Sequence, residues 1–147
     1  MTKTFMLEEL HLTFCSIIRT FNSTTIRRIG LFQGKHFSCE CVRCKDPTEL
    51  KSYASAVLCS DGGTIVADDP LDLTKDAMWK CQECSLTIPA LQIASQEKDV
   101  IMDLNSIQKD DVRGLEDFLS RYKKVLHPTH AAIMEVRLIS YLNRQVL

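Results

Sequence analysis

The sequence predicts a mainly α-helical protein with a small irregular zinc-binding region. Three cysteines, Cys39, Cys41 and Cys44, form a C-x-C-x-x-C cluster, and the pair Cys81-x-x-Cys84 follows downstream. The beginning and the last third of the chain carry apolar residues at helical spacing. The segment between them has little apolar bulk, so we expect a bound metal to hold its shape. Thiolates this close in sequence can converge on one tetrahedral zinc.

The bulk composition is that of one ordinary domain or of two small units. The chain has 147 residues, of which 45% are hydrophobic and 25% are charged. A net charge of −1 gives no general attraction to nucleic acid. The basic clusters Arg27-Arg28 and Arg121–Lys124 are interpreted as solvated helix faces. The sequence therefore carries no strong nucleic-acid signal.

Cysteine usage and the N-terminal residues indicate a reducing compartment. Seven cysteines occur at uneven spacing, which favours metal binding over disulfide formation. Glu8, Glu9 and His11 interrupt the apolar N-terminal run, and no small-residue cleavage site follows it. No segment has the length needed to span a membrane. We expect a cytoplasmic or nuclear protein, or one found in both compartments.

The N-terminal part is predicted to be helical. Residues 5–21 form one apolar stripe, and Cys15 within it is interpreted as a small buried hydrophobic residue. Residues 22–25 are predicted to be a loop and helix cap. Gly30 and Gly34 are predicted to bracket a short turn before the cysteine cluster.

A second helix start is predicted after the cluster. Asp46 suits the N-cap, Pro47 the first helical position, and Glu49 can reach back to the cap. The helix is expected to continue through Val57 and to deliver Cys59. A short strand is then predicted over residues 64–67, and Trp79 is interpreted as a residue that packs against a zinc knuckle.

The last third is predicted to form amphipathic helices. The first covers residues 88–105, with at most one break, and the second is capped by Asp110 or Asp111. The segment His127–His130 ends the second helix, and its histidines are assigned turn and capping roles. Thr129 is predicted to cap a third helix, which would make an antiparallel pair with the second.

Setting Cys15 aside, six cysteines remain, and they form two groups: the first trio (Cys39, Cys41 and Cys44) and the second trio (Cys59, Cys81 and Cys84). Two structural zinc sites require eight ligands. In one alternative Cys59 completes a single site with the first trio. In another, each trio holds its own metal, completed by His36 or Asp61. In a third, the missing ligands lie on a segment that the chain does not contain. We favour two trios, because a single site would leave the C-x-x-C pair without a role.

Several separated motifs resemble one protein family. Residues 27–28 and 35–50 resemble the post-SET segment of the SET- and MYND-domain (SMYD) lysine methyltransferases. Cys59, Gly62-Gly63 and residues 69–72 and 79–84 look like the arthropod branch called SmydA, and residues 115–130 are similar to its tetratricopeptide-like helices. The resemblance covers about residues 25–147.

The resemblance implies a fold and a cofactor. It implies a post-SET-like zinc-binding region over 25–87, followed by an incomplete helical C-terminal region of tetratricopeptide-like helices over 88–147. Outside the resemblance, the apolar pattern predicts an N-terminal amphipathic helix over residues 1–24, to which no role is assigned. In the family, the post-SET cysteines bind zinc with a fourth cysteine from the SET core, and this loop closes over S-adenosylmethionine and the lysine. Phe37 occupies the position of the aromatic residue that lies against the cofactor's adenine. A simple packing role is the alternative for Phe37.

The departures from the family limit the expected function. The sequence contains no N-H-S-C segment, no glycine-rich cofactor entry and no MYND cysteine cluster. Lys51 stands where the family usually has glycine, and Gly62 falls near the expected second cysteine of a C-x-x-C pair. No catalytic residue is assigned. We expect the C-terminal part of a SET/MYND-type methyltransferase that supplies a zinc-bound lid and a helical interaction surface, without catalysing alone and with S-adenosylmethionine bound only in a complete SET domain. The alternative is a stand-alone zinc-dependent module whose helices bind a protein or peptide partner.

Overall fold

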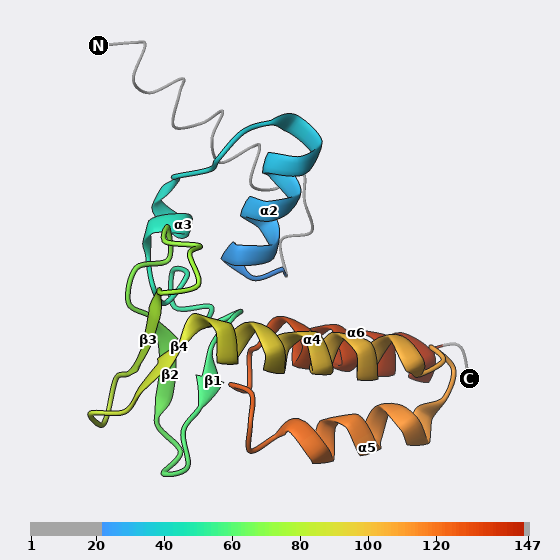
Figure 1. The fold of residues 1–147 in the computed structure, drawn as a ribbon. Helices are drawn as coiled ribbons and strands as arrows, with labels where there is room; N and C mark the ends of the chain where they lie inside the picture. Colours follow the sequence, from blue (N-terminus) through green and yellow to red (C-terminus); the bar gives the residue numbers. More distant parts are fainter. Residues whose placement is uncertain (1–21, 146–147) are drawn as a thin grey trace.

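The computed structural model describes residues 22–145 and combines helices with one small antiparallel sheet (Figure 1). The helices supply most of the regular structure, as predicted, but the middle region contains a four-stranded sheet and is less irregular than predicted. The elements in chain order are α2 (Thr24–Lys35), α3 (Val42–Lys45), β1 (Val57–Leu58), β2 (Thr64–Ala67), β3 (Met78–Cys81), β4 (Thr87–Pro89), α4 (Ala90–Ser106), α5 (Val112–Tyr122) and α6 (Ala131–Gln145).

Helix α2 begins at the predicted cap and ends later than predicted. The Ser23 side chain accepts a hydrogen bond from the Ile26 N–H, which satisfies one of the otherwise unpaired first-turn amides. The predicted turn between Gly30 and Gly34 is wrong, because both glycines lie inside the helix. His36 ends the helix with a left-handed φ of 53°.

The predicted helix after Asp46 is also wrong. The Asp46 carboxylate accepts hydrogen bonds from the Thr48 and Leu50 N–H groups, but a series of turns follows it. Glu49, Leu50 and Lys51 have φ values of 52°, 58° and 63°, which are incompatible with a right-handed helix. Local capping signals are weak and are overridden here by distant partners of Glu49.

The sheet has the order β1-β2-β3-β4 with antiparallel neighbours. The predicted strand over residues 64–67 is confirmed as β2, which pairs Ile65 with Cys81 and Ala67 with Trp79 of β3. Trp79 is buried in the same apolar cluster as Cys59 and Cys81, so its predicted packing role is confirmed.

The three C-terminal helices run back and forth beside the sheet (Figure 1). Helix α4 is continuous, and Asp111 caps α5 by accepting a hydrogen bond from the Gly114 N–H, as predicted. Helices α5 and α6 form the predicted antiparallel pair. One apolar core joins these helices to the sheet through Ile65, Trp79, Ile93, Val100, Leu115, Phe118, Leu126, Ile133 and Val136.

The His127–His130 segment attaches the helices to the turn region. The Thr129 hydroxyl donates to the Ser52 carbonyl over 2.6 Å, and the His127 ring stacks on Tyr53 with centroids 4.7 Å apart. The predicted Thr129 cap is wrong by one residue, because the His130 Nδ1 accepts the Ala132 N–H over 3.2 Å. The predicted turn and capping role of the histidines is confirmed.

The predicted helix over 5–21 and the role of Cys15 lie outside the described residues. Within residues 22–145, no helix combines the length and apolar content needed to cross a lipid bilayer.

Candidate metal centres

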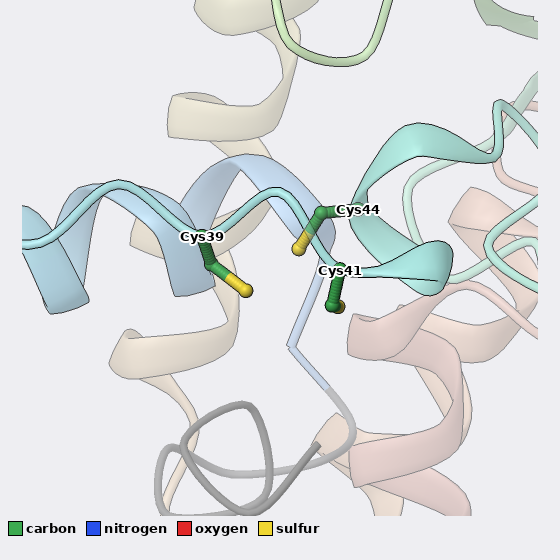
Figure 2. A group of neighbouring side chains, drawn as sticks. All are labelled: Cys39, Cys41 and Cys44. Atoms are coloured by element: carbon green, nitrogen blue, oxygen red, sulfur yellow. The ribbon is translucent and has the colours of Figure 1, made fainter. Parts of the chain in front are cut away.

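The first trio forms a compact, buried group of thiols. Cys39 and Cys44 are fully buried and Cys41 is 7% exposed. All three Sγ atoms lie within 4.8 Å of one another, with Cys44 projecting from α3 toward Cys39 (Figure 2). Converging thiols at this separation suit a tetrahedral zinc, whose Zn–S distance is about 2.3 Å. The predicted trio is therefore confirmed as a spatial group that could hold zinc.

Two buried arginines of α2 support this group. The Arg28 Nε donates to the Cys39 carbonyl over 2.9 Å, and its Nη1 donates to the Leu71 carbonyl over 2.8 Å, so one side chain ties the thiol loop to a distant turn. The Arg27 guanidinium lies 3.8 Å from the Cys44 Sγ. The interpretation of Arg27-Arg28 as a solvated face is wrong, since their exposed fractions are 0% and 7%.

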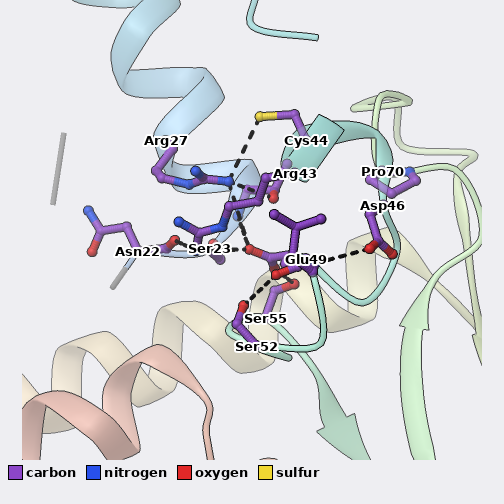
Figure 3. Close-up of polar contacts among 12 residues, drawn as sticks. Asn22, Ser23, Arg27, Arg43, Cys44, Asp46, Glu49, Ser52, Ser55 and Pro70 are labelled. Carbon is purple, nitrogen blue, oxygen red and sulfur yellow. Dashed lines mark hydrogen bonds and ion pairs between the residues drawn. The ribbon is translucent and has the colours of Figure 1, made fainter. Parts of the chain in front are cut away.

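A buried carboxylate fixes Arg27 and the thiol loop together (Figure 3). Glu49 Oε2 accepts the Thr24 N–H over 3.0 Å and lies 3.9 Å from Arg27 Nη2 and 3.5 Å from Arg43 Nη2. The other carboxylate oxygen accepts the Ser55 hydroxyl. A buried charge needs hydrogen-bond and ion-pair partners, because moving one ion out of water costs on the order of several kcal/mol. Glu49 therefore holds the turn region against the start of α2.

Without a bound cation, the surroundings of the first trio oppose ionisation of its thiols. Burial, followed by the neighbouring Cys41 and Cys39, raises the pKa of the Cys44 thiol to about 12. Arg27 opposes this rise only in part. Thiolates are the form that binds metal. A divalent cation would supply the positive charge that lets all three thiols ionise together.

The second trio gathers at one end of the sheet. Its three Sγ atoms also lie within 4.8 Å of one another. Cys59 follows β1, Cys81 ends β3 and Cys84 lies in the following turn, with 3.7 Å between the Cys59 and Cys81 Sγ atoms. Cys84 is exposed, unlike any member of the first trio. The second predicted trio is thus also confirmed as a spatial group that could hold zinc.

Backbone amides surround the sulfurs of the second trio. The Gly63 N–H donates to the Cys59 Sγ over 3.2 Å. Burial tends to raise the pKa of the Cys59 thiol, but N–H groups of Asp61 and Gly63 and the neighbouring thiols lower it overall. The amides of Glu83 and Cys84 lower the pKa of the Cys81 thiol, but burial and the neighbouring Cys84 and Cys59 thiols raise it overall. Amides aimed at a sulfur stabilise thiolate character, which a metal ligand requires.

The structure bears on two of the three sequence-based alternatives for the cysteines. Cys59 lies with Cys81 and Cys84, so the single site formed by Cys59 and the first trio is wrong. His36 and Asp61 are exposed, and neither is gathered with a trio. Phe37 is half-buried and packs against the first trio, while its contact with a cofactor remains a prediction.

Sequence reasoning missed four residues around these centres. Arg27, Arg28 and Glu49 support the first trio, and the Glu83 carboxylate lies 3.5 Å from the Cys81 Sγ of the second. The sequence offered one signal for the two arginines, namely a basic pair shortly before a cysteine cluster whose thiolates would be negatively charged. No local signal marks Glu49, because its partners lie far away in the sequence.

Two centres of three thiols, joined to a small sheet and a helical region, define a protein able to hold two zinc ions. The chain is 35% identical over 100 residues to the SET domain-containing protein SmydA-8, isoform B, of Drosophila melanogaster. These aligned residues make up 67% of this chain and 22% of that protein. Isoform A is 33% identical over 96 residues, covering 64% and 21%. No protein-family model matches the chain.

These similarities confirm the predicted kinship. The chain is a SmydA-like relative of the SMYD proteins and spans about a fifth of the length of the SmydA-8 isoforms that it matches.

Proposed function

We propose that this chain acts as the zinc-stabilised lid and helical C-terminal region of a SET/MYND-type protein-lysine methyltransferase. The observation that carries the proposal is the buried first trio, clamped by Arg28 in the segment that resembles a post-SET loop. The similarity to SmydA-8 supports the same family context. Catalysis requires the SET core, so this chain alone transfers no methyl group.

The lid role follows from how zinc stabilises a small loop. Binding energy for a structural zinc is folding energy, which a segment with few apolar anchors otherwise lacks. Phe37 lies two positions before Cys39 and packs on the trio, so the metal would also fix the position of this ring. In a complete SET domain, that ring would lie against the adenine of S-adenosylmethionine, and the protein would act in the cytoplasm, the nucleus or both.

Metal analysis and calorimetry test this proposal on the purified chain. We expect bound zinc and no measurable heat of S-adenosylmethionine binding. We also expect loss of the folded state when a strong chelator removes the metal. Tight cofactor binding, or methyl transfer to a histone or other protein by this chain alone, would contradict the proposal.

Exposed apolar side chains favour a second candidate, a zinc-dependent module that binds a protein or peptide. Leu91 and Met102 of α4 are 67% and 61% exposed, and Tyr141 and Leu142 of α6 are 60% and 53% exposed. Apolar residues on neighbouring helices form the kind of surface that binds partner helices or peptides. Helices α5 and α6 also line a cavity of about 290 Å³.

Light scattering and dye binding separate the two candidates. A partner-binding module should bind a dye specific for exposed apolar surface, or should self-associate. A monomer that binds no such dye would leave only the lid function.

A further inference from the structure

The second trio provides three thiols, whereas structural zinc sites close four positions. A C-x-x-C pair beginning at Cys59 would place its second thiol at position 62. That position holds Gly62, whose left-handed φ of 83° disfavours a cysteine there. The fourth ligand must therefore come from another residue or from solvent.

The Glu83 carboxylate lies beside the thiols. Its Oε2 is 3.5 Å from the Cys81 Sγ, and the Cys59 and Cys81 Sγ atoms are 3.7 Å apart. Zn–S bonds of about 2.3 Å and Zn–O bonds of about 2.1 Å put tetrahedral ligands roughly 3.8 Å (S to S) and 3.6 Å (S to O) apart. Both separations are close to those of a tetrahedral site with one carboxylate ligand.

Gly63 marks the point on which these atoms converge. A Cβ added to Gly63 would lie 2.6 Å from the Cys81 Sγ, 2.9 Å from the Glu83 Oε2 and 3.1 Å from the Cys59 Sγ. Two sulfurs and one carboxylate oxygen thus surround a single position that any side chain at residue 63 would obstruct. The glycine keeps the approach to the trio open.

A backbone amide positions the carboxylate. The Thr64 N–H donates to the Glu83 Oε2 over 2.6 Å, and metal-ligating carboxylates typically receive such outer hydrogen bonds. Glu83 lies outside the set of atoms that are all within 4.8 Å, so its carboxylate must turn toward the ion. The side chain is exposed and long enough to turn. Asp61, by contrast, offers its N–H to Cys59.

We propose that the Glu83 carboxylate is the fourth ligand of the second centre, which makes it a Cys3Glu zinc site. The inference rests on the proposed binding of zinc by this chain. It distinguishes the second centre from an all-thiolate structural site. It also gives the centre a ligand that is weaker and more exchangeable than a thiolate.

Zinc competition with a chromophoric chelator tests the proposal on the full chain. Glu83→Gln keeps an oxygen that can accept the Thr64 N–H but loses the carboxylate charge. We expect it to weaken the affinity for one of two zinc ions at least tenfold, in line with the lower end of known effects near metal sites. Asp61→Asn is the matched control and should change neither affinity more than about twofold on the same scale. Cobalt substitution should show altered ligand-field bands only in Glu83→Gln.

Circular dichroism of the variants at saturating zinc checks for a merely structural effect, and their spectra should match that of the wild type. Unchanged zinc affinity and cobalt spectrum in Glu83→Gln would overturn the assignment of Glu83 while leaving zinc binding intact. A loss in Asp61→Asn instead would assign the fourth position to Asp61 and also overturn it. A wild-type chain with no ion at the second centre would overturn this inference together with the proposed zinc binding there.

Discussion

The two thiol centres hold the same number of cysteines in opposite surroundings. The first lies in the interior, where Arg27 and Arg28 approach its sulfur and backbone atoms. The second lies at the end of the sheet, where backbone amides and the Glu83 carboxylate approach its sulfurs. Side chains from distant elements therefore build one centre, while local turns build the other.

This difference predicts how tightly each centre keeps a metal. Three thiolates with one zinc ion carry a net charge of −1, which the Arg27 guanidinium can offset in the interior. Among the described residues, no arginine contacts the sulfurs of the second centre, and Cys84 opens it to solvent. We therefore expect the first centre to release zinc more slowly.

The largest expected effect comes from removing one thiol of each centre. Cys44→Ser should cost several kcal/mol and unfold the region around α2, because zinc binding supplies on the order of 10 kcal/mol in small structural sites. Cys84→Ser, at an exposed ligand, should cost about 1 to 2 kcal/mol. Urea unfolding of the zinc-loaded variants measures both costs. Equal costs would contradict the expectation that the first centre contributes more to stability than the second.

Breaking the buried ion pairs should weaken the first centre alone. Glu49→Gln leaves the charge of Arg27 buried without its carboxylate, and such losses cost about 3 to 5 kcal/mol. Urea unfolding measures the cost, and the cobalt spectrum of the second centre should not change. Glu40→Gln, an exposed residue of the same loop, is the control and should stay within about 0.5 kcal/mol of wild type.

Acid should lower the free energy of unfolding of the region around His130, at the start of α6. Burial, followed by the nearby His127, lowers the pKa of His130 from 6.5 to about 4. The unfolded chain then binds a proton at higher pH than the folded chain, so stability is full above pH 6.5 and is lost as pH falls toward 4. The loss should reach up to about 3 kcal/mol.

His130→Asn provides the control for this pH effect. Asparagine offers an oxygen to cap α6 but does not titrate in this range. Unfolding of both zinc-loaded proteins is measured from pH 7 to 4, and the difference between the two profiles isolates the contribution of His130, because metal release affects both proteins alike. If the variant and the wild type lose stability in parallel, His130 is not the source of the acid response.

The smallest expected effect lies in the turns next to the first centre. Lys51 has a φ of 63°, which disfavours non-glycine residues by about 1 to 2 kcal/mol. Lys51→Gly should raise the unfolding free energy by roughly 0.5 to 1 kcal/mol, since glycine's greater unfolded freedom offsets part of the gain. Thermal melting against Lys51→Ala, which keeps the strain, measures this. Equal melting temperatures of the two variants would contradict the claim that the backbone at residue 51 is strained.

Sequence reasoning succeeded where contacts are local. Cys39, Cys41 and Cys44 must lie close together because so few residues separate them, and Ser23 and Asp111 cap the helices that follow them. The second trio was predicted from the spacing of one pair and from the absence of another role for it. These features depend on neighbours within a few residues.

Sequence reasoning failed where contacts between residues far apart in the chain decide the conformation. The helix predicted after Asp46 does not form, since Glu49 binds the start of α2 in place of its own turn. Strands β1, β3 and β4 were missed because their pairing, such as that of Cys81 in β3 with Ile65 in β2, is set by the fold and by very few side chains. The burial of Arg27 likewise depends on a carboxylate 22 positions away.

Stepwise removal of zinc by a chelator, with metal content measured at each step, tests the existence of two separate centres most directly. We expect two zinc ions per chain, a fast phase from the second centre and a slow phase from the first, with loss of the folded state after the slow phase. A chain that binds fewer than two ions, or that keeps its structure when fully stripped of metal, would contradict this account.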